Sequence, residues 1–320
     1  MSVNNVHAFS MRIHVKAYIP IPKGERREIK FITTMKKLFI VAFAALGMLA
    51  CTNQNAPITP PEIGEGFSVS QNKRVLFSQG NLQYQASTKT WRFAAHQYDT
   101  IGAANKNIST SYSGWIDLFG WGTGNNPTLT SKSASDYQTF TDWGVNPISN
   151  GGNKANQWRT LTSEEWLFLL HERTNAINLI GLGTVNGVNG AIILPDRWTT
   201  PSGLEFYPSK EKGLSWQIDH YYDYTLERNH FTDNTYTSTD WSKMEAAGAI
   251  FLPTAGRRYA GSNGKALVAC VGEYGNYYTA TLPEGTLPFS LFFSSNSLDP
   301  KEFGQPRSQA YSVRLVQDVE

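Results

Sequence analysis

The sequence predicts an α+β domain of mostly antiparallel strands, with few helices and long loops. Three observations lead to this prediction. Aromatic residues make up 13% of the 320 residues and charged residues only 17%, a composition that favours a compact domain over a disordered chain. From Phe67 onward, short segments alternate apolar and polar residues, as half-buried strands do. One strong helix-start motif follows at Thr162.

The N-terminal part of this domain is expected to form β-hairpins. Apolar residues occupy every second position in short segments, and polar or glycine-containing turns separate these segments. The apolar pairs are Phe67/Val69, Val75/Phe77, Leu82/Tyr84 and Trp91/Phe93, and the turns lie at residues 71–72, 80–81 and 87–88.

Residues 102–152 are expected to form long, ordered loops. The stretch is rich in Gly, Asn, Ser and Thr, which favour turns over regular elements. It also carries large aromatic side chains that can hold loops against a core, namely Trp115, Phe119, Trp121, Phe140 and Trp143.

The clearest helix signal comes next. Thr162 and Glu165 have the spacing of a capping box, in which each side chain binds a free backbone N–H of the first turn. Trp166, Leu169 and Leu170 follow at helical spacing, so we expect an amphipathic helix that packs its apolar face on the sheet.

Two later segments resemble each other and predict buried strands. Residues 190–195 and 248–253 each enter from glycine, continue through apolar residues and stop at proline. A short helix is expected from residue 241 to residue 247, where Gly248 ends it. The closing strands are predicted within residues 274–281, 289–293 and 310–316.

The segment from Met35 to Cys51 has the order of residues of a bacterial lipoprotein signal peptide. Two lysines follow Met35, then an apolar stretch, and Met48-Leu49-Ala50 precedes the cysteine. The basic end stays in the cytoplasm while the apolar stretch enters the bilayer, and this stretch is too short to span comfortably as a permanent helix. We therefore expect residues 35–50 to be removed and Cys51 to carry lipid.

The rest of the domain organisation follows from this cleavage. Residues 1–34 are basic and patternless and are expected to be an upstream extension from a misassigned start codon. Residues 51–66 contain several prolines and glycines and predict a lipidated tether. Residues 67–320 are expected to form a single globular domain, since this length supports a substantial core.

Removal of the precursor changes the charge of the protein. Residues 1–50 hold eight of the 28 Lys and Arg and two of the 26 Asp and Glu, which leaves 20 basic against 24 acidic residues and a net charge of −4. A mildly acidic chain lacks the basic surface that nucleic acids require, so no nucleic-acid partner is expected. Cys270 is the only cysteine besides Cys51, and its apolar surroundings predict a buried, inert thiol.

Four motifs in order carry a family resemblance: Trp158-Arg159-Thr160-Leu161-Thr162-Ser163-Glu164-Glu165-Trp166, Phe251-Leu252-Pro253-Thr254-Ala255-Gly256-Arg257-Arg258, Gly275-Asn276-Tyr277-Tyr278-Thr279-Ala280-Thr281 and Tyr311-Ser312-Val313-Arg314-Leu315-Val316. Over about residues 115–316 the chain resembles the Fibrobacter succinogenes major paralogous domain proteins. These exported proteins are related in fold to C-type lectins and to the formylglycine-generating enzyme. The resemblance implies a C-type-lectin-like fold, in which terminal strands pair and long loops project from one side.

Two departures limit what this resemblance implies about chemistry. The formylglycine-generating enzyme holds copper with a cysteine pair, whereas here only Cys270 remains beyond the lipid-bearing Cys51, so that oxidase chemistry is excluded. Calcium-dependent lectins carry Glu-Pro-Asn or Gln-Pro-Asp, and the nearest match here is Gln305-Pro306-Arg307. Lectin-type calcium coordination therefore does not transfer, and no cofactor is expected.

Two sets of candidate site residues remain. A divalent metal such as calcium has candidate ligands in His220, Asp223 and His230, because imidazoles and carboxylates suit divalent ions, although a solvated loop explains the same residues. Aromatic rings in loops can stack on sugars or anchor protein partners, although glycine-flanked tryptophans also serve as structural anchors. These aromatic candidates are Trp115, Trp121, Trp143, Tyr221, Tyr222 and Tyr224.

The sequence therefore predicts a non-enzymatic envelope protein, lipid-anchored to the outer membrane, that binds a glycan or protein ligand for adhesion or capture. Its location on the cell surface or on the periplasmic face stays open. One alternative is a structural subunit of a surface assembly such as a fimbrial tip. A second alternative is a polysaccharide hydrolase that uses a carboxylate of residues 219–233. Glu164 and Glu165 do not form such a pair, because adjacent helical residues point about 100° apart.

Overall fold

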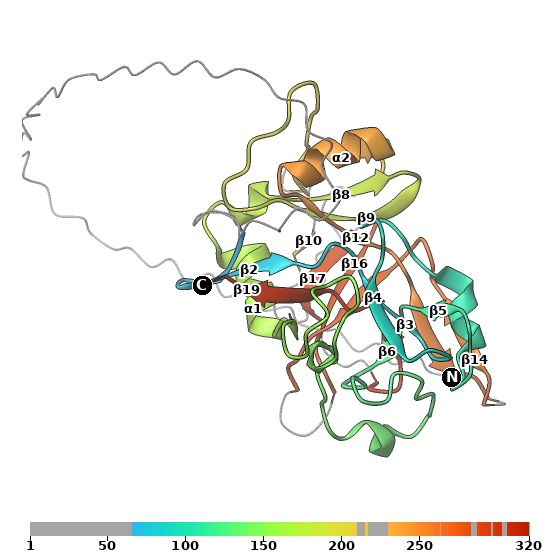
Figure 1. Cartoon of the computed structure of the whole chain (residues 1–320). Helices are drawn as coiled ribbons and strands as arrows, with labels where there is room; N and C mark the ends of the chain where they lie inside the picture. The colour runs from blue at the N-terminus through green and yellow to red at the C-terminus, as the bar shows by residue number, and fades with distance from the viewer. Residues whose placement is uncertain are drawn as a thin grey trace, which may run out of the picture. The chain divides into compact units, whose positions relative to one another are not determined.

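In the computed structural model (Figure 1), every described residue belongs to the compact unit formed within residues 59–320. The described residues are 66–209, 230–262, 264–282, 287–295, 297–302 and 306–319, together with the backbone of 215–216. The predicted signal peptide, Cys51 and most of the predicted tether lie outside them.

The first sheet joins the two ends of the domain. Its strand order is β1-β2-β19-β7. The hairpin of β1 (Phe67–Ser70) and β2 (Lys73–Phe77) pairs through β2 with β19 (Leu315–Asp318), which in turn pairs with β7 (Arg159–Thr160). Figure 1 shows β2 and β19 side by side. All these pairs are antiparallel, and the earliest and latest described strands share one sheet.

The second sheet has the strand order β11-β8-β9-β12, and the helix α2 packs against it. It contains β8 (Ile180–Val185), β9 (Val188–Ile193), β11 (Thr235–Tyr236) and β12 (Ile250–Pro253). The helix α2 (Ser238–Ala246) places Trp241 and Met244 in one buried cluster with Phe251 of β12. The two segments predicted as buried strands thus form β9 and β12, which pair directly with Ile193 opposite Ile250.

Three further sheets complete the described strands. They are β4-β3-β5, β14-β13-β18-β6 and β10-β17-β16-β15. Their bounds are β3 (Leu82–Gln85), β4 (Thr90–Phe93), β5 (Trp115–Ile116), β6 (Phe119–Gly120), β10 (Ser215–Trp216), β13 (Arg257–Ala260), β14 (Ala266–Ala269), β15 (Gly275–Tyr278), β16 (Ser290–Ser294), β17 (Ser297–Glu302) and β18 (Ala310–Tyr311). Among the strands described, only β8–β11 and β10–β17 pair in parallel. The predicted class, mostly antiparallel strands with few helices, is confirmed.

The helical elements are short, and the α-helices are few, as predicted. The capping box at α1 (Ser163–Leu167) is formed in both directions: the Thr162 hydroxyl accepts from the Glu165 N–H, and Glu165 accepts from the Thr162 N–H. The chain continues as a π-helical turn, η4 (Phe168–Glu172). The 3₁₀ turns are η1 (Gly102–Asn107), η2 (Ala134–Tyr137), η3 (Trp143–Val145) and η5 (Ala176–Asn178).

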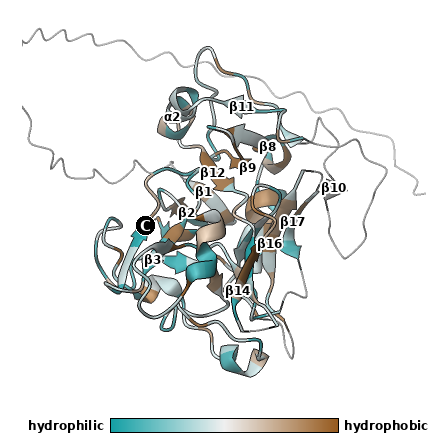
Figure 2. Cartoon of the chain, turned by 90° about the vertical axis from the view of Figure 1, so that its right-hand side faces the viewer, coloured by the Kyte–Doolittle hydropathy of each residue, from teal (hydrophilic) through white to brown (hydrophobic). Residues whose placement is uncertain are grey.

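Aromatic side chains hold the long loops of residues 102–152, as the sequence predicts. Phe119, Trp121 and Trp143 are buried, and the Trp121 indole N–H donates to the carbonyl of Thr279 at 3.2 Å. Gly144 follows Trp143 because a Cβ there would lie 1.8 Å from the backbone oxygen of Trp158. Figure 2 shows hydrophobic colouring concentrated on strands such as β12 and β16.

The prediction of a buried Cys270 is wrong. Cys270 is half-buried, with a left-handed backbone at φ 59°, because it lies in the turn that follows β14. That strand is at the edge of its sheet, where Leu267 is 46% exposed and Val268 is only partly buried against a small hydrophobic cluster.

No helix in the described part of the chain has the length and apolar composition needed to cross a bilayer.

Candidate functional site

The predicted aromatic site residues fall into three groups. Trp121 and Trp143 are 2% and 0% exposed, so neither ring can stack on a ligand from solvent, and the alternative role as structural anchors holds for both. Trp115 is partly exposed, but the Arg92 guanidinium lies 3.7 Å from its ring centroid and covers one face. The remaining candidates, Tyr221, Tyr222 and Tyr224, lie outside the described residues.

The predicted metal ligands are likewise only partly described. His230 is exposed, and its backbone N–H donates to Asp233 Oδ2 at 2.9 Å. His220 and Asp223 lie outside the described residues. Elsewhere in the described residues, no group of at least three His, Cys, Asp or Glu side chains is placed to hold a metal ion.

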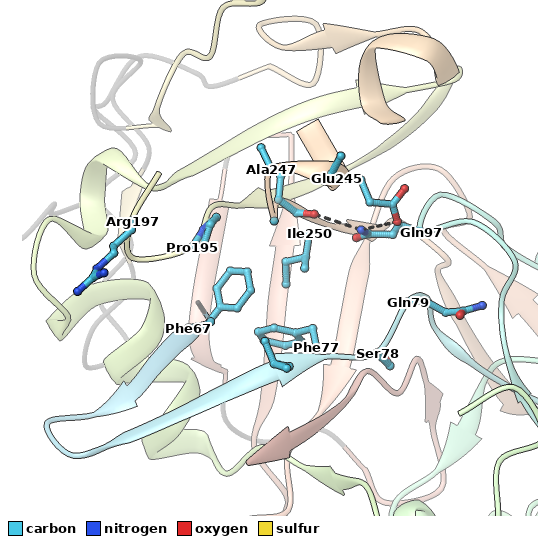
Figure 3. Close-up of a pocket in the computed structure, with 15 residues that line it drawn as sticks. Phe67, Phe77, Ser78, Gln79, Gln97, Pro195, Arg197, Glu245, Ala247 and Ile250 are labelled. Atoms are coloured by element: carbon cyan, nitrogen blue, oxygen red, sulfur yellow. Dashed lines mark hydrogen bonds between the residues drawn. The ribbon is translucent and has the colours of Figure 1, made fainter. Parts of the chain in front are cut away.

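A cavity lies beside the β1–β2 hairpin and was not predicted from the sequence. It has a volume of about 620 Å³, within the range of sites that bind small ligands. Its walls come from the hairpin, the loop that follows β9, the end of α2 and the start of β12. We call it the hairpin cleft, and its central residues are Phe67, Phe77, Gln97, Pro195, Arg197, Glu245 and Ile250 (Figure 3).

The floor of the hairpin cleft is apolar and aromatic. Figure 3 shows Phe67, Phe77 and Ile250 facing the same space. The Phe67 and Phe77 rings meet edge to face, with centroids 5.0 Å apart, and Phe77 also lies 5.7 Å from the Trp166 ring centroid. Phe77 is only partly buried, so its ring is supported by the core on one side and is available to a ligand on the other.

An ion pair fixes one wall of the cleft. Asp196, which follows Pro195, accepts hydrogen bonds from the Ser68 hydroxyl at 2.6 Å and from Arg173 Nη1 at 2.9 Å. Burial alone would raise the pKa of the Asp196 carboxyl, but the bonds from Ser68 and Arg173 outweigh it and lower that pKa. Because the carboxylate joins β1 to the loop after β9, the distance between these two walls is set by a charged interaction.

The end of α2 forms a second wall. The chain leaves the helix through a Schellman motif, in which the Gly248 N–H donates to the Glu245 carbonyl at 2.8 Å and the Ala249 N–H to the Met244 carbonyl at 3.0 Å. Gly248 has the left-handed φ of 96° that this turn requires. The helix therefore presents its C-terminal end, which carries partial negative charge, to the cleft.

Polar side chains form the rim. Gln97 Nε2 donates to Glu245 Oε1 at 2.8 Å and to the Ala249 carbonyl at 3.1 Å, and Figure 3 shows this pair at one end of the cleft, near Gln79. Arg197 extends from the other end. Because Gln97 is only 3% exposed, a ligand at that end meets the Glu245 carboxylate and the Gln79 amide, and Arg197 lines the other end with its guanidinium directed outward (Figure 3).

A buried arginine supports the amide end of the rim. Arg314 Nη2 donates to Gln97 Oε1 at 2.9 Å, and Arg314 is 2% exposed. Burial lowers the pKa of its guanidinium to about 10. The Gln97 amide oxygen thus accepts from the buried Arg314, and its amide nitrogen donates to Glu245. These two bonds fix the orientation of the amide.

The chemistry of the lining favours binding. Glu245 is the only carboxylate among the described residues that line the cleft, whereas glycoside hydrolysis uses two carboxyl groups about 5–10 Å apart. An aromatic floor with amide, carboxylate and guanidinium groups at its ends is suited to a ligand that has both apolar faces and hydroxyl groups.

No protein-family model matches the chain, and no curated protein or solved structure gives a match either. The resemblance to the Fibrobacter succinogenes major paralogous domain proteins thus stays a prediction.

Proposed function

We propose that this protein is a non-enzymatic, lipid-anchored envelope protein that binds a glycan in the hairpin cleft, for adhesion or capture. The observation that carries the proposal is the cleft itself. Its apolar floor includes a partly exposed phenylalanine, and its polar rim has amide and carboxylate groups at one end and a guanidinium at the other. Sugar rings have an apolar face that packs on an aromatic ring and hydroxyls that bond to amides and carboxylates.

The construction of the cleft supports this role. Its floor is continuous with the core through Trp166, and its walls are held by the Asp196–Arg173 pair and by the Schellman turn. A site whose side chains are already held in place loses less conformational entropy when a ligand binds.

The anchoring and the fold belong to the same proposal. The signal-peptide pattern before Cys51 supports lipid attachment at that residue. The antiparallel pairing of β2 with β19 is what a C-type-lectin-like fold requires of its terminal strands. In this proposal the tether of residues 51–66 presents the cleft to ligands outside the outer membrane or in the periplasm.

A binding screen followed by variants of the rim tests the proposal. Residues 52–320 include the whole of the described compact domain, so the screen uses this part of the chain on a glycan array, with a pull-down of envelope proteins in parallel. Arg197→Ala removes an exposed guanidinium, and Glu245→Gln removes a charge but keeps an oxygen for Gln97. We expect each to weaken binding of the retained glycan about tenfold, as loss of one charge-assisted hydrogen bond does.

The matched control is Glu273→Gln, which makes the same chemical change at an exposed residue outside the cleft and should leave glycan affinity unchanged. Retention of an envelope protein and of no glycan would replace the proposed ligand with a protein partner, as in a surface assembly. Turnover of a retained polysaccharide would contradict the non-enzymatic role.

A further inference from the structure

A second hollow, on the sheet that contains β13, carries basic side chains. It has a volume of about 450 Å³ and shares no residue with the hairpin cleft. We call it the basic hollow, and its lining includes Lys132, Arg257, Tyr259, Pro306, Ser308 and Gln309. No carboxylate is among the described residues that line it.

Strand register explains why these side chains meet. Arg257 and Tyr259 are two residues apart on β13, so their side chains lie on the same face, whereas Arg258 points to the opposite face. Tyr259 pairs with Leu267 of β14, and these residues are 37% and 46% exposed. One face of the β13–β14 hairpin therefore presents a guanidinium beside an exposed aromatic ring and an exposed leucine.

The two cations of the hollow lack an anionic partner. Within the described part of the chain, neither Lys132 nor Arg257 forms an ion pair. The contacts of Arg257 are neutral: its Nη1 is 3.5 Å from Gln309 Oε1, its side chain hydrogen-bonds the Tyr311 hydroxyl, and its buried Nε has no hydrogen-bond partner among the described residues. A guanidinium has five N–H donors, and these neutral contacts leave part of that set, and the whole positive charge, without an anion.

A third cation behind the hollow adds to the positive field. Arg258 is 1% exposed and donates to the Thr130 hydroxyl at 2.9 Å and to the Leu118 carbonyl at 3.1 Å. Burial lowers the pKa of its guanidinium to about 10. These hydrogen-bond partners are neutral, so the charge of Arg258 is not cancelled locally and favours an anion nearby.

Buried side chains hold both loops of the hollow. Arg258 binds Thr130, and the Tyr137 hydroxyl accepts from the Ser131 N–H at 3.0 Å, so the residues before Lys132 are fixed. On the other side, the Tyr278 hydroxyl donates to the Gln309 carbonyl at 2.7 Å. The basic hollow is thus a preformed site rather than a set of independent surface lysines and arginines.

We propose that the basic hollow binds a saccharide that carries a carboxylate. The carboxylate lies against Arg257 and Lys132, where the guanidinium and the ammonium supply charge-assisted hydrogen bonds that their neutral partners do not replace. The sugar ring packs on Tyr259, and its hydroxyls bond to Ser308 and Gln309. The inference does not depend on the hairpin cleft, because the two sites have separate linings.

The shape and composition of the hollow favour a saccharide over an acidic peptide. The anionic position is confined to two side chains, Lys132 and Arg257, whereas the rest of the lining offers an aromatic face, a hydroxyl and an amide. These groups match a ring with several hydroxyls and one charge. An acidic peptide would place further carboxylates where no cation lines the hollow.

Isothermal titration of residues 52–320 tests the inference with three probes: a trisaccharide with one galacturonic acid residue, the same trisaccharide with that carboxyl group reduced to a hydroxymethyl group, and triglutamate. We expect the uronate to bind at least about tenfold more tightly than the reduced sugar. Its affinity should fall as the salt concentration increases. We also expect it to bind more tightly than triglutamate.

Variants locate the binding. Lys132→Ala changes an exposed side chain, and Arg257→Lys keeps the charge but removes the bidentate donors; each should weaken uronate binding about tenfold. Lys154→Ala, an exposed lysine outside the hollow, is the matched control and should have no effect. The inference is overturned by a uronate that does not bind at millimolar concentration, by equal affinity for the reduced sugar or triglutamate, or by unchanged binding in Lys132→Ala.

Discussion

Asp117 is expected to make the stability of this domain depend on pH. It is 0% exposed, and its carboxylate accepts from Asn105 Nδ2 at 2.7 Å and from the Ile101 N–H at 2.9 Å. Burial raises the pKa of this carboxyl from 3.8 to about 6, because these hydrogen bonds only partly offset the loss of water. No cation forms an ion pair with it in the described part of the chain.

The magnitude follows from the two pKa values. A group whose pKa is raised in the folded state stabilises it fully below the unfolded pKa and loses this contribution as the pH rises through the folded pKa. For Asp117 the window runs from 3.8 to about 6. At about 1.4 kcal/mol per pH unit, the free energy of unfolding falls by about 3 kcal/mol across it through this group alone.

Urea denaturation of the wild type and of Asp117→Asn, from pH 3.5 to pH 7.5, measures this effect. Asparagine does not titrate. Its amide nitrogen would face one of the two N–H donors that Asp117 accepts from, so the variant is destabilised by an amount that does not change with pH. All other titrating groups are shared, so the difference between the two stability curves should shift by about 3 kcal/mol in favour of the variant as the pH rises. A difference that stays constant with pH would refute the reasoning.

Two further predictions concern the wall of the cleft and the anchor. Asp196→Ala leaves the Arg173 guanidinium, whose side chain is 2% exposed, without its carboxylate, so urea denaturation should show a loss of about 3 kcal/mol. The same change at Asp318, whose side chain is 47% exposed, should cost less than about 1 kcal/mol. Equal losses would contradict the role assigned to the Asp196–Arg173 ion pair. Cys51→Ser should abolish incorporation of labelled fatty acid and release the protein from the membrane fraction; continued labelling would rule out Cys51 as the lipid site.

Local patterns were sufficient to predict much of the fold. Alternating residues at 67–93 form β1 to β4, and the capping box at Thr162 begins α1. The alternating pattern and the capping box each depend on residues that are close in sequence, so both can be recognised without knowledge of the tertiary structure. The glycine–proline segments became β9 and β12 for the same reason.

The β8–β9 hairpin was missed although the sequence contains its signal. Asn186-Gly187 joins the two strands with φ 49° and 80°, the left-handed pair of a two-residue turn. Gly181 and Gly183 interrupt the apolar alternation of β8, which hides the strand. Gly183 is required there, since a Cβ would lie 2.7 Å from the Asn234 carbonyl oxygen.

The hairpin cleft could not be predicted, because its lining comes from residues far apart in the sequence. Phe67, Gln97, Arg197 and Glu245 belong to separate segments, and only the packing of α2 and β12 beside the first hairpin brings them together. The sequence predicted loop tryptophans as ligand-binding residues instead, yet Trp121 and Trp143 are core residues. An aromatic residue in a glycine-rich loop does not reveal by itself which side it faces.

A crystal structure of residues 52–320 with the glycan retained in the screen tests the central claim most directly. We expect a sugar ring packed on Phe77, with its hydroxyls within hydrogen-bond distance of Glu245 at one end and Arg197 at the other. A glycan bound elsewhere on the domain, with the hairpin cleft empty, would contradict it.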